Sequence, residues 1–144
     1  MKVKYTQDIT NPVYQDALAI RKNVFINEQG VALKREVDSD EKNTIHFVLY
    51  DETNTPLATV RLLPSANQVK VQRMAVLKEE RKKGYGRLLM QAIEKYARKS
   101  HFDKIALGAQ LTAQNFYQKL GYQPEGEVFI DADIKHISMV KDIS

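Results

Sequence analysis

Three strand-like runs in the first half of the chain constrain its fold more than any other feature. IHFVLY (45–50) and LATVRLL (57–63) are separated by DETNTP (51–56), whose turn-forming residues predict a hairpin. A third run, VKVQRMAV (69–76), alternates between apolar and polar residues and then becomes apolar. This succession predicts an antiparallel sheet in the first half of the chain.

Helical patterns lie before and after these runs. One predicted helix begins at Asn11-Pro12 and ends near Gly30, one follows residue 86, and one covers 111–120. Residues 31–44 are polar and acidic and are predicted to form a loop. Further strands are expected at 2–6, 104–109, 127–130 and 136–140. The order β-α-loop-β-β-β-α-β-α-β-β predicts a mixed α/β (α+β) fold.

Composition narrows the class of protein. The length of 144 residues, without a repeat or a Gly/Ser linker, suits one domain over residues 1–144. No apolar run approaches the ~20 residues of a membrane span, and the first residues lack a signal-peptide pattern. The absence of cysteine excludes a thiolate nucleophile and disulfides, and a cytoplasmic location is expected. A net charge of +4 indicates an anionic partner, and charge alone leaves nucleic acid, a membrane surface or a phosphorylated ligand open.

The segment between the third strand and the next helix, LKEERKKGYGR (77–87), combines cations with two glycines. A helix N-terminus offers unpaired N–H groups and a partial positive charge, which together hold phosphate. Glycines let the backbone approach an anion closely. A solvated basic turn is the alternative, but the strand–loop–helix context favours a phosphate site. Four cations surround this point: Arg81, Lys82, Lys83 and Arg87.

Two familiar phosphate motifs are absent from this loop. The residues after Gly84 do not give the G-x-x-x-x-G-K-[ST] pattern. The dinucleotide fingerprint needs a third glycine three residues after Gly86, and that position is Leu89. The loop therefore matches neither of these two phosphate-binding motifs.

Residues 81–86 follow the pattern R-x-x-G-x-G, and the chain resembles the GCN5-related N-acetyltransferase (GNAT) superfamily at this point. QNFYQKLGY (114–122) is similar to the second part of the family signature. RKNVFINEQGV (21–31), EVDSD (36–40) and DADIKHISM (131–139) resemble a small bacterial subgroup without an assigned substrate. The resemblance covers nearly the whole chain and implies a GNAT-like acyl-CoA N-acyltransferase fold with acetyl-coenzyme A as co-substrate.

The resemblance also implies how the donor is bound. In the family, the strand before the loop diverges from its neighbour, and its free backbone groups bind the pantetheine arm. The N–H of Met74 is then expected at the thioester carbonyl, and Val76 at a pantetheine amide. The implied donor-binding residues are Met74, Ala75, Val76, Arg81, Lys82, Lys83, Gly84, Tyr85, Gly86, Arg87, Asn115 and Tyr117.

Tyr117 lies where the family places its general acid, which protonates the leaving thiolate. The alternative is an aromatic residue of the core, as is expected for its neighbour Phe116. Asn115 is expected to face the donor, or else to be a solvated helix residue.

The general base is the least defined role. Glu28 is the best candidate because it lies seven residues after Arg21, on the same predicted helix face. An ion pair between these two residues is the alternative. Glu36, Asp38 and Asp40 form either a negative rim that attracts a cationic amine or a solvated loop. His136 either faces the acceptor or is structural, so the acceptor-side candidates are Arg21, Glu28, Glu36 and His136.

These observations predict an enzyme that moves acetyl directly to a primary amine of a small molecule or peptide, without an acyl-enzyme. A catalytically silent coenzyme A-binding module is the alternative. The three histidines, His46, His101 and His136, show no metal-ligand spacing, so no metal is expected. Neither nucleic acid nor a membrane is expected as partner, because the cations concentrate at one loop. Many members of the family pair as homodimers, and this chain is open to the same arrangement.

Overall fold

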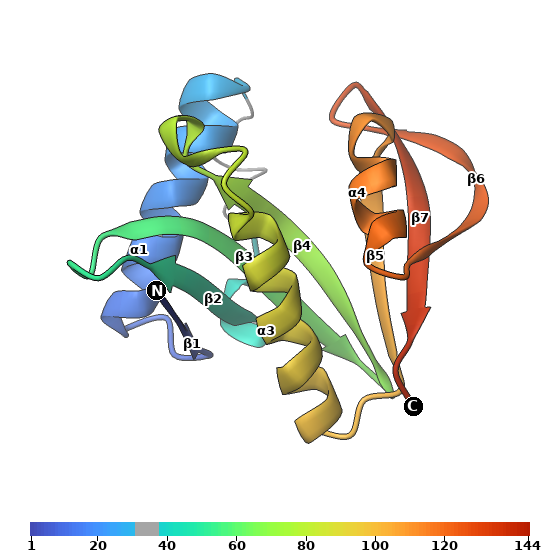
Figure 1. Cartoon of the computed structure of the whole chain (residues 1–144), viewed down its shortest axis with the longest axis horizontal. Helices are drawn as coiled ribbons and strands as arrows, with labels where there is room; N and C mark the ends of the chain where they lie inside the picture. Colours follow the sequence, from blue (N-terminus) through green and yellow to red (C-terminus); the bar gives the residue numbers. More distant parts are fainter. Residues whose placement is uncertain (31–37) are drawn as a thin grey trace.

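The computed structural model describes residues 1–30 and 38–144 (Figure 1). Its framework is a seven-stranded sheet in the order β1-β2-β3-β4-β5-β7-β6. Only β4 and β5 run parallel, and every other neighbouring pair is antiparallel. The fold class and element order predicted from the sequence are confirmed. The strands are β1 (Lys2–Thr6), β2 (Ile45–Tyr50), β3 (Pro56–Ser65), β4 (Gln68–Val76), β5 (Lys104–Gln110), β6 (Gln123–Asp131) and β7 (Ile134–Asp142).

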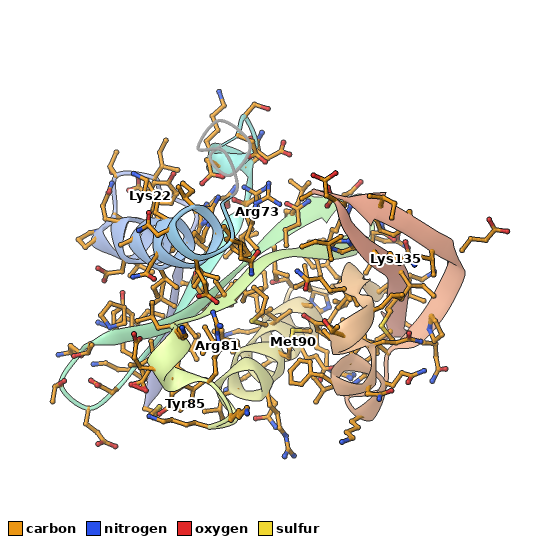
Figure 2. The ribbon with its side chains drawn as sticks, turned by 90° about the horizontal axis from the view of Figure 1, so that it is seen from above. Lys22, Arg73, Arg81, Tyr85, Met90 and Lys135 are labelled. Carbon is orange, nitrogen blue, oxygen red and sulfur yellow. The ribbon has the colours of Figure 1, made fainter. Side chains whose placement is uncertain are left out.

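Helices cover both faces of the sheet (Figures 1 and 2). α1 (Pro12–Arg21), extended by the π-helix η1 (Lys22–Glu28), lies on one face. α3 (Tyr85–Lys99) and α4 (Gln114–Lys119) lie on the other face. We call these the α1 face and the α3 face. Three short 3₁₀ turns complete the described elements: η2 (Glu41–Asn43), η3 (Lys78–Glu80) and η4 (Leu111–Ala113).

The first helix begins where the sequence predicts it. The Asn11 side chain accepts a hydrogen bond of 2.9 Å from the Val13 N–H, and proline occupies the first turn. Its second half is a π-helix, whose i→i+5 bonds include Gln29 N–H to the Val24 carbonyl at 3.1 Å. Wider turns change the angular spacing of side chains. Residues seven apart across this stretch therefore do not keep the shared face predicted for a regular α-helix.

The core has one layer on each face of the sheet. On β2, Phe47 and Leu49 pack toward α3, and Val48 packs toward α1, as alternation along a strand requires. The larger layer lies under α3, whose Leu89, Met90, Ile93 and Ala97 are buried. The smaller layer joins Ala17, Ile20 and Val24 to Val48, Tyr50 and Ala75.

A β-bulge interrupts β4 at the point that matters most for the site. Thr59 pairs with Ala75 and Arg61 pairs with Gln72, so Arg73 and Met74 together oppose one residue of β3. The extra residue reverses the alternation of side chains. Val69 and Val71 face the α3 side before the bulge, and Met74 and Val76 face the same side after it.

Candidate active site between two diverging strands

The central feature of the site is the divergence of β4 and β5. Their pairing covers only Gln68–Val71 and Lys104–Leu107. Beyond these residues the strands separate into a V, which opens at the upper edge of the sheet (Figure 1). In the described part of the chain, the backbone groups of β4 after Val71 that point toward β5 have no strand partner there. Unpaired strand edges of this kind bind extended ligands through backbone hydrogen bonds.

Two cavities meet at this V. The larger, about 600 Å³, is lined by Phe25 and Gln29 of the first helix and by residues of β4–β7, and we call it the α1-side cavity. The smaller, about 460 Å³, lies against the start of α3 and α4, and we call it the α3-side cavity. Five residues line both cavities: Met74, Val76, Arg81, Ala113 and Tyr117. A ligand in one cavity can therefore reach a ligand in the other through the gap between the strands.

The loop before α3 lines the α3-side cavity with free backbone donors. Gly84 is the residue before the helix and has φ 83°, a conformation that glycine adopts without strain. Within the described residues, the N–H groups of Tyr85, Gly86 and Arg87 donate no hydrogen bond, and the first bonded amide is that of Leu88 to the Gly84 carbonyl at 3.2 Å. Free donors of this kind, together with the helix dipole, can hold a phosphate group.

A close contact with the other wall of this cavity favours glycine at position 86. A Cβ atom on Gly86 would lie 3.3 Å from Cζ of Phe116, because the ring of α4 packs onto the first turn of α3. The prediction that Phe116 belongs to the core is wrong: 37% of its surface is exposed, and its ring lines the cavity. The short α4 turns this side chain outward and its neighbour Tyr117 inward.

The four cations of the loop fall into two classes. Arg81 forms two hydrogen bonds of 2.7 Å with the Glu28 carboxylate and a third, of 3.0 Å, with the Val76 carbonyl. Lys83 donates to Glu80 at 2.8 Å and lines neither cavity. Lys82 and Arg87 line the α3-side cavity and have no ion pair with any described residue. These two side chains are the cations available to an anion beside the free amides.

Glu28 lies outside both cavities, although sequence reasoning chose it as the base. The hydrogen bonds from Arg81 hold the pKa of this carboxyl below its usual value, which weakens it as a proton acceptor. It also does not pair with Arg21, which is bound to Glu41 instead. The π-helix between the two residues is the physical reason that their predicted common face is lost.

Tyr117 stands at the junction of the two cavities. Only 8% of the residue is exposed, and its ring packs edge-on against Phe116 and Tyr122. Burial raises the pKa of its hydroxyl to about 12, so the group stays protonated through the physiological range. The hydroxyl has no hydrogen-bond partner in the described part of the chain. It is therefore a proton donor without a competing protein acceptor.

The bulge in β4 places a residue with a strained backbone conformation, Arg73, beside the site. Arg73 has φ 58°, an uncommon conformation for a residue with a side chain. Gln72, Arg73 and Met74 all line the α1-side cavity. The bulge therefore aims the backbone of Met74 and the side chains on either side of it at the V.

A buried ion network supports the bulge from the α1 face. Glu41 receives two hydrogen bonds from Arg21, at 2.7 and 3.0 Å, and is also paired with Arg61. Arg61 in turn contacts Asp38 at 2.9 Å, and its Nε donates to the Gln72 side chain at 3.0 Å. Asp38 also accepts a hydrogen bond of 3.3 Å from Arg73 (labelled in Figure 2). The network joins the first helix, η2, β3 and the bulged part of β4.

This network uses one of the carboxylates that was predicted to form an acceptor rim. Burial by itself raises the pKa of Asp38, but the hydrogen bonds and charge of Arg61 outweigh it and lower the pKa to about 2. Burial also acts to raise the pKa of Glu41, but the hydrogen bonds and charge of Arg21 outweigh it and hold that pKa below its usual value. Asp38 thus pairs with Arg61 and Arg73 and lines neither cavity. Asp40 precedes η2 and lines neither cavity, and Glu36 lies outside the described residues.

The structure brings most, but not all, of the predicted donor-binding residues to the cavities. Asn115 and Lys83 line neither cavity, and Ala75 lines only the α1-side cavity. Among the acceptor-side candidates, His136 lines the α1-side cavity. Arg21 is buried, does not line this cavity and binds Glu41. The residues that line the α3-side cavity as predicted are Met74, Val76, Arg81, Lys82, Gly84, Tyr85, Gly86, Arg87 and Tyr117.

The sequence did not predict the buried ion network or several of the residues that line the α1-side cavity. Arg61 carried a signal, because a charged residue in the middle of an apolar strand is rarely buried without a partner. Glu41 carried none, since it lies in a polar loop and its partners are distant in sequence. The aromatic residue Phe129 and the amides of Gln72 and Gln110 also line the α1-side cavity without any motif.

Residues 1–30 and 38–144 contain no group of three or more His, Cys, Asp or Glu side chains arranged to hold a metal ion. No helix among the described elements is both long enough and apolar enough to cross a bilayer.

Comparison with known proteins gives a consistent result. Residues 11–143 match the family model of an acetyltransferase (GNAT) domain. The N-acetyltransferase YjcF of Bacillus subtilis, itself uncharacterized, is 37% identical over 89% of this chain and 91% of its own. A crystal structure of a candidate N-acetyltransferase from Lactobacillus plantarum has a TM-score of 0.92 at 28% identity, covering 99% of this chain and 98% of that one. An aminoglycoside 6'-N-acetyltransferase complexed with coenzyme A shares the fold, with a TM-score of 0.73 at 19% identity over 100% and 98% of the two chains.

Proposed function

Because this chain belongs to the GNAT acetyltransferase family, we propose that it transfers acetyl from acetyl-coenzyme A directly to a primary amine of a small molecule or peptide. The observation that carries this proposal is the pair of cavities on opposite faces of the sheet, joined at Met74, Val76 and Tyr117. The acyl donor occupies the α3-side cavity and the amine occupies the α1-side cavity. The thioester and the nitrogen then meet in the V.

The start of α3 binds the pyrophosphate of the donor. The free amides of Tyr85, Gly86 and Arg87 and the positive end of the helix supply the main attraction. Lys82 and Arg87 add charge beside them. Arg81 lines both cavities and orders the end of β4 through the Val76 carbonyl.

The diverging part of β4 binds the pantetheine arm and the thioester. The backbone of Val76 pairs with a pantetheine amide, and the N–H of Met74 donates to the thioester carbonyl. A preorganised donor of this kind stabilises the developing oxyanion by ~3 kcal/mol. The strained bulge at Arg73 supports this role, because strain that the fold maintains is typical of functional sites.

Tyr117 gives its proton to the sulfur as the carbon–sulfur bond breaks. Its position at the junction supports this role, as does the absence of a hydrogen-bond partner for its hydroxyl within residues 1–30 and 38–144. Direct transfer needs no nucleophile from the protein, in agreement with a chain that has no cysteine. Two cavities that meet at one V support a ternary complex over an acyl-enzyme, because both substrates can then be held side by side.

The Glu28→Gln variant tests the pairing with Arg81. We expect turnover close to wild type, because Glu28 lines neither cavity and a lost general base would cost about 10²-fold or more. The ion pair is partly exposed, so the dissociation constant for coenzyme A should change by no more than about fivefold. Steady-state kinetics and isothermal titration measure both quantities. A fall of two orders of magnitude in kcat at unchanged affinity would restore Glu28 as the base.

Donor binding is tested first by thermal unfolding with acetyl-coenzyme A. At 100 times its dissociation constant the donor should stabilise the fold by ~2.7 kcal/mol. The double variant Lys82→Ala/Arg87→Ala should bind the donor about tenfold more weakly and so keep only about half of this effect at the same concentration, because the backbone amides remain. Lys99→Ala, at the other end of the same helix, is the matched control and should keep it. Stabilisation that is equal in all three proteins would contradict the proposed phosphate site.

Turnover is then tested with a panel of primary amines, read out as thiol release. A coenzyme A-binding module without activity is the competing function. It predicts the same stabilisation by acetyl-coenzyme A and no amine-dependent thiol release with any acceptor. The two experiments therefore separate binding from catalysis.

A further inference from the structure

We propose that His136 is the general base that takes a proton from the acceptor amine. This inference rests on the proposed function and adds the catalytic group that neither the sequence motif nor Glu28 supplies. Three observations carry it: the face of the sheet on which His136 lies, the hydrogen bond made by one of its ring nitrogens, and the other ionisable groups around the α1-side cavity.

The strand register places His136 on the α1 face. Ile105, Leu107 and Ala109 of β5 pack into the core under α3, so Gly108 and Gln110 face the opposite side. His136 of β7 is directly across from Gln110, and opposite residues of paired strands share a face. The imidazole therefore lies on the same side as the α1-side cavity, which it lines.

An aromatic neighbour places the ring beside the V. Phe129 of β6 pairs with His136, and the two rings stack with centroids 5.7 Å apart at 23°. The tip of the Phe129 ring would lie 3.3 Å from a Cβ on Gly108, so it packs directly on the β5 backbone. Gly108 follows Leu107, the last residue of β5 that pairs with β4. The Phe129–His136 stack thus covers the β5 wall where the V begins to open.

The hydrogen bond of one ring nitrogen defines the other as an acceptor. Nδ1 of His136 lies 2.8 Å from the Ile134 carbonyl oxygen, which can only accept, so Nδ1 carries the proton. In the neutral ring, Nε2 then holds a lone pair. Nε2 has no hydrogen-bond partner among the described residues. Fixing the tautomer through one nitrogen in this way orients the other for proton transfer.

The remaining ionisable groups around the cavity are poorer bases. Lysine and arginine side chains are protonated at neutral pH, and burial keeps Tyr117 protonated. Asp131 lies opposite Ile134 in the strand register, at the end of the β6–β7 hairpin. A carboxylate is a weaker base than imidazole. Imidazole is the side chain whose ordinary pKa lies near neutrality, as general base catalysis requires. The other charged or titratable groups that line this cavity are Lys70, Arg73, Arg81, Tyr117 and Asp131.

The protons balance over the reaction. Nε2 takes one proton from the ammonium, and the neutral nitrogen attacks the thioester carbon, forming the C–N bond. The intermediate collapses with cleavage of the C–S bond, and the sulfur receives the Tyr117 proton. The new amide nitrogen still carries two protons, and one of them passes to the Tyr117 phenolate through solvent. His136 releases its proton to solvent. The products are the acetylated amine, the free thiol and one proton.

The test uses the His136→Asn variant. The asparagine NH₂ group replaces Nδ1–H as donor to the Ile134 carbonyl, and the basic nitrogen is lost. With a primary alkylamine as acceptor we expect kcat to fall by about 10²-fold, with unchanged stabilisation by acetyl-coenzyme A. The ascending limb of the kcat/KM profile should move to higher pH, toward the pKa of the amine itself.

A second acceptor separates a base from a structural residue. In the β-fluorinated analogue of the same alkylamine, fluorine lowers the amine pKa, so more of the acceptor is already neutral. We expect the defect of His136→Asn to shrink strongly with this acceptor, which a purely structural role would not produce. His136→Gln, checked by circular dichroism, repeats the measurement in case the first variant folds poorly.

Different failures have different meanings. An absence of amine-dependent thiol release by the wild-type protein overturns the proposed function, and this inference with it. Normal turnover of His136→Asn, or an equal defect with both acceptors, overturns the role of His136 alone. The His101→Asn variant, at an exposed histidine that lines neither cavity, should keep its turnover, and an equal loss in that variant would overturn the assignment to His136.

Discussion

Replacing Glu41 with glutamine should destabilise the protein by about 3–5 kcal/mol, a large share of the stability of an ordinary domain. The carboxylate is buried between Arg21 and Arg61, which are themselves almost fully buried. Glutamine keeps the size of the side chain but removes its charge, so two buried guanidinium groups lose the counter-ion that they share. Chemical denaturation followed by circular dichroism measures the loss.

A surface carboxylate provides the control for this experiment. Glu52 is highly exposed, and its ion pair is a 3.7 Å contact with the N-terminal amine. Glu52→Gln should change the free energy of unfolding by less than about 0.5 kcal/mol. A loss below 1 kcal/mol for Glu41→Gln would show that the buried network contributes little to stability.

The same network sets the acid limit of the fold. The pKa of Asp38 is lowered to about 2 by Arg61, against the opposing effect of burial, and that of Glu41 is lowered as well. In the unfolded chain such carboxyls titrate near ~4. Their stabilisation is therefore complete above about pH 5 and is lost as the pH falls through 4 toward 2. Unfolding midpoints measured across this range should fall less steeply in Glu41→Gln than in wild type.

Replacing Tyr117 with phenylalanine should lower kcat by about 10²-fold or more while the affinity for coenzyme A stays unchanged. The hydroxyl binds no described residue, so its removal should cost little stability. Its pKa of about 12 also predicts that no loss of activity from Tyr117 ionisation appears below about pH 10. Stopped-flow measurement of thiol release separates the chemical step from donor binding.

Tyr122 offers a matched control for this substitution. Its ring lies against that of Tyr117, its hydroxyl is buried, and it lines neither cavity. The hydroxyl has no partner in the described part of the chain, so Tyr122→Phe should leave turnover unchanged and stability equal or slightly higher. An equal loss of activity in both variants would indicate a packing effect and would contradict the acid role of Tyr117.

The predictable parts of this protein are those governed by local physics. The strand–loop–helix unit around Gly84 and Gly86 could be predicted from the sequence. Its glycines, its cations and the start of its helix all lie within a few residues of one another. The element order followed from hydrophobic periodicity and turn residues. The same local reasoning identified the capping of the first helix by Asn11, which the structure confirms.

The parts that escaped prediction depend on contacts between distant segments. The bulge at Arg73–Met74 adds one residue to a run that reads as a regular strand, and its location is determined by the pairing with β3. The π-helix likewise interrupts a pattern that suits an α-helix. Glu41 joins residues 20 positions away on either side, a relation that no local pattern encodes.

The two-sided arrangement of the cavities has a consequence for how such proteins diversify. In the proposed arrangement, the donor and the amine occupy separate cavities, which share only the five residues at the V. Gene copies can therefore accumulate substitutions on the amine side and acquire new acceptors, while the machinery for the activated acyl group is inherited intact.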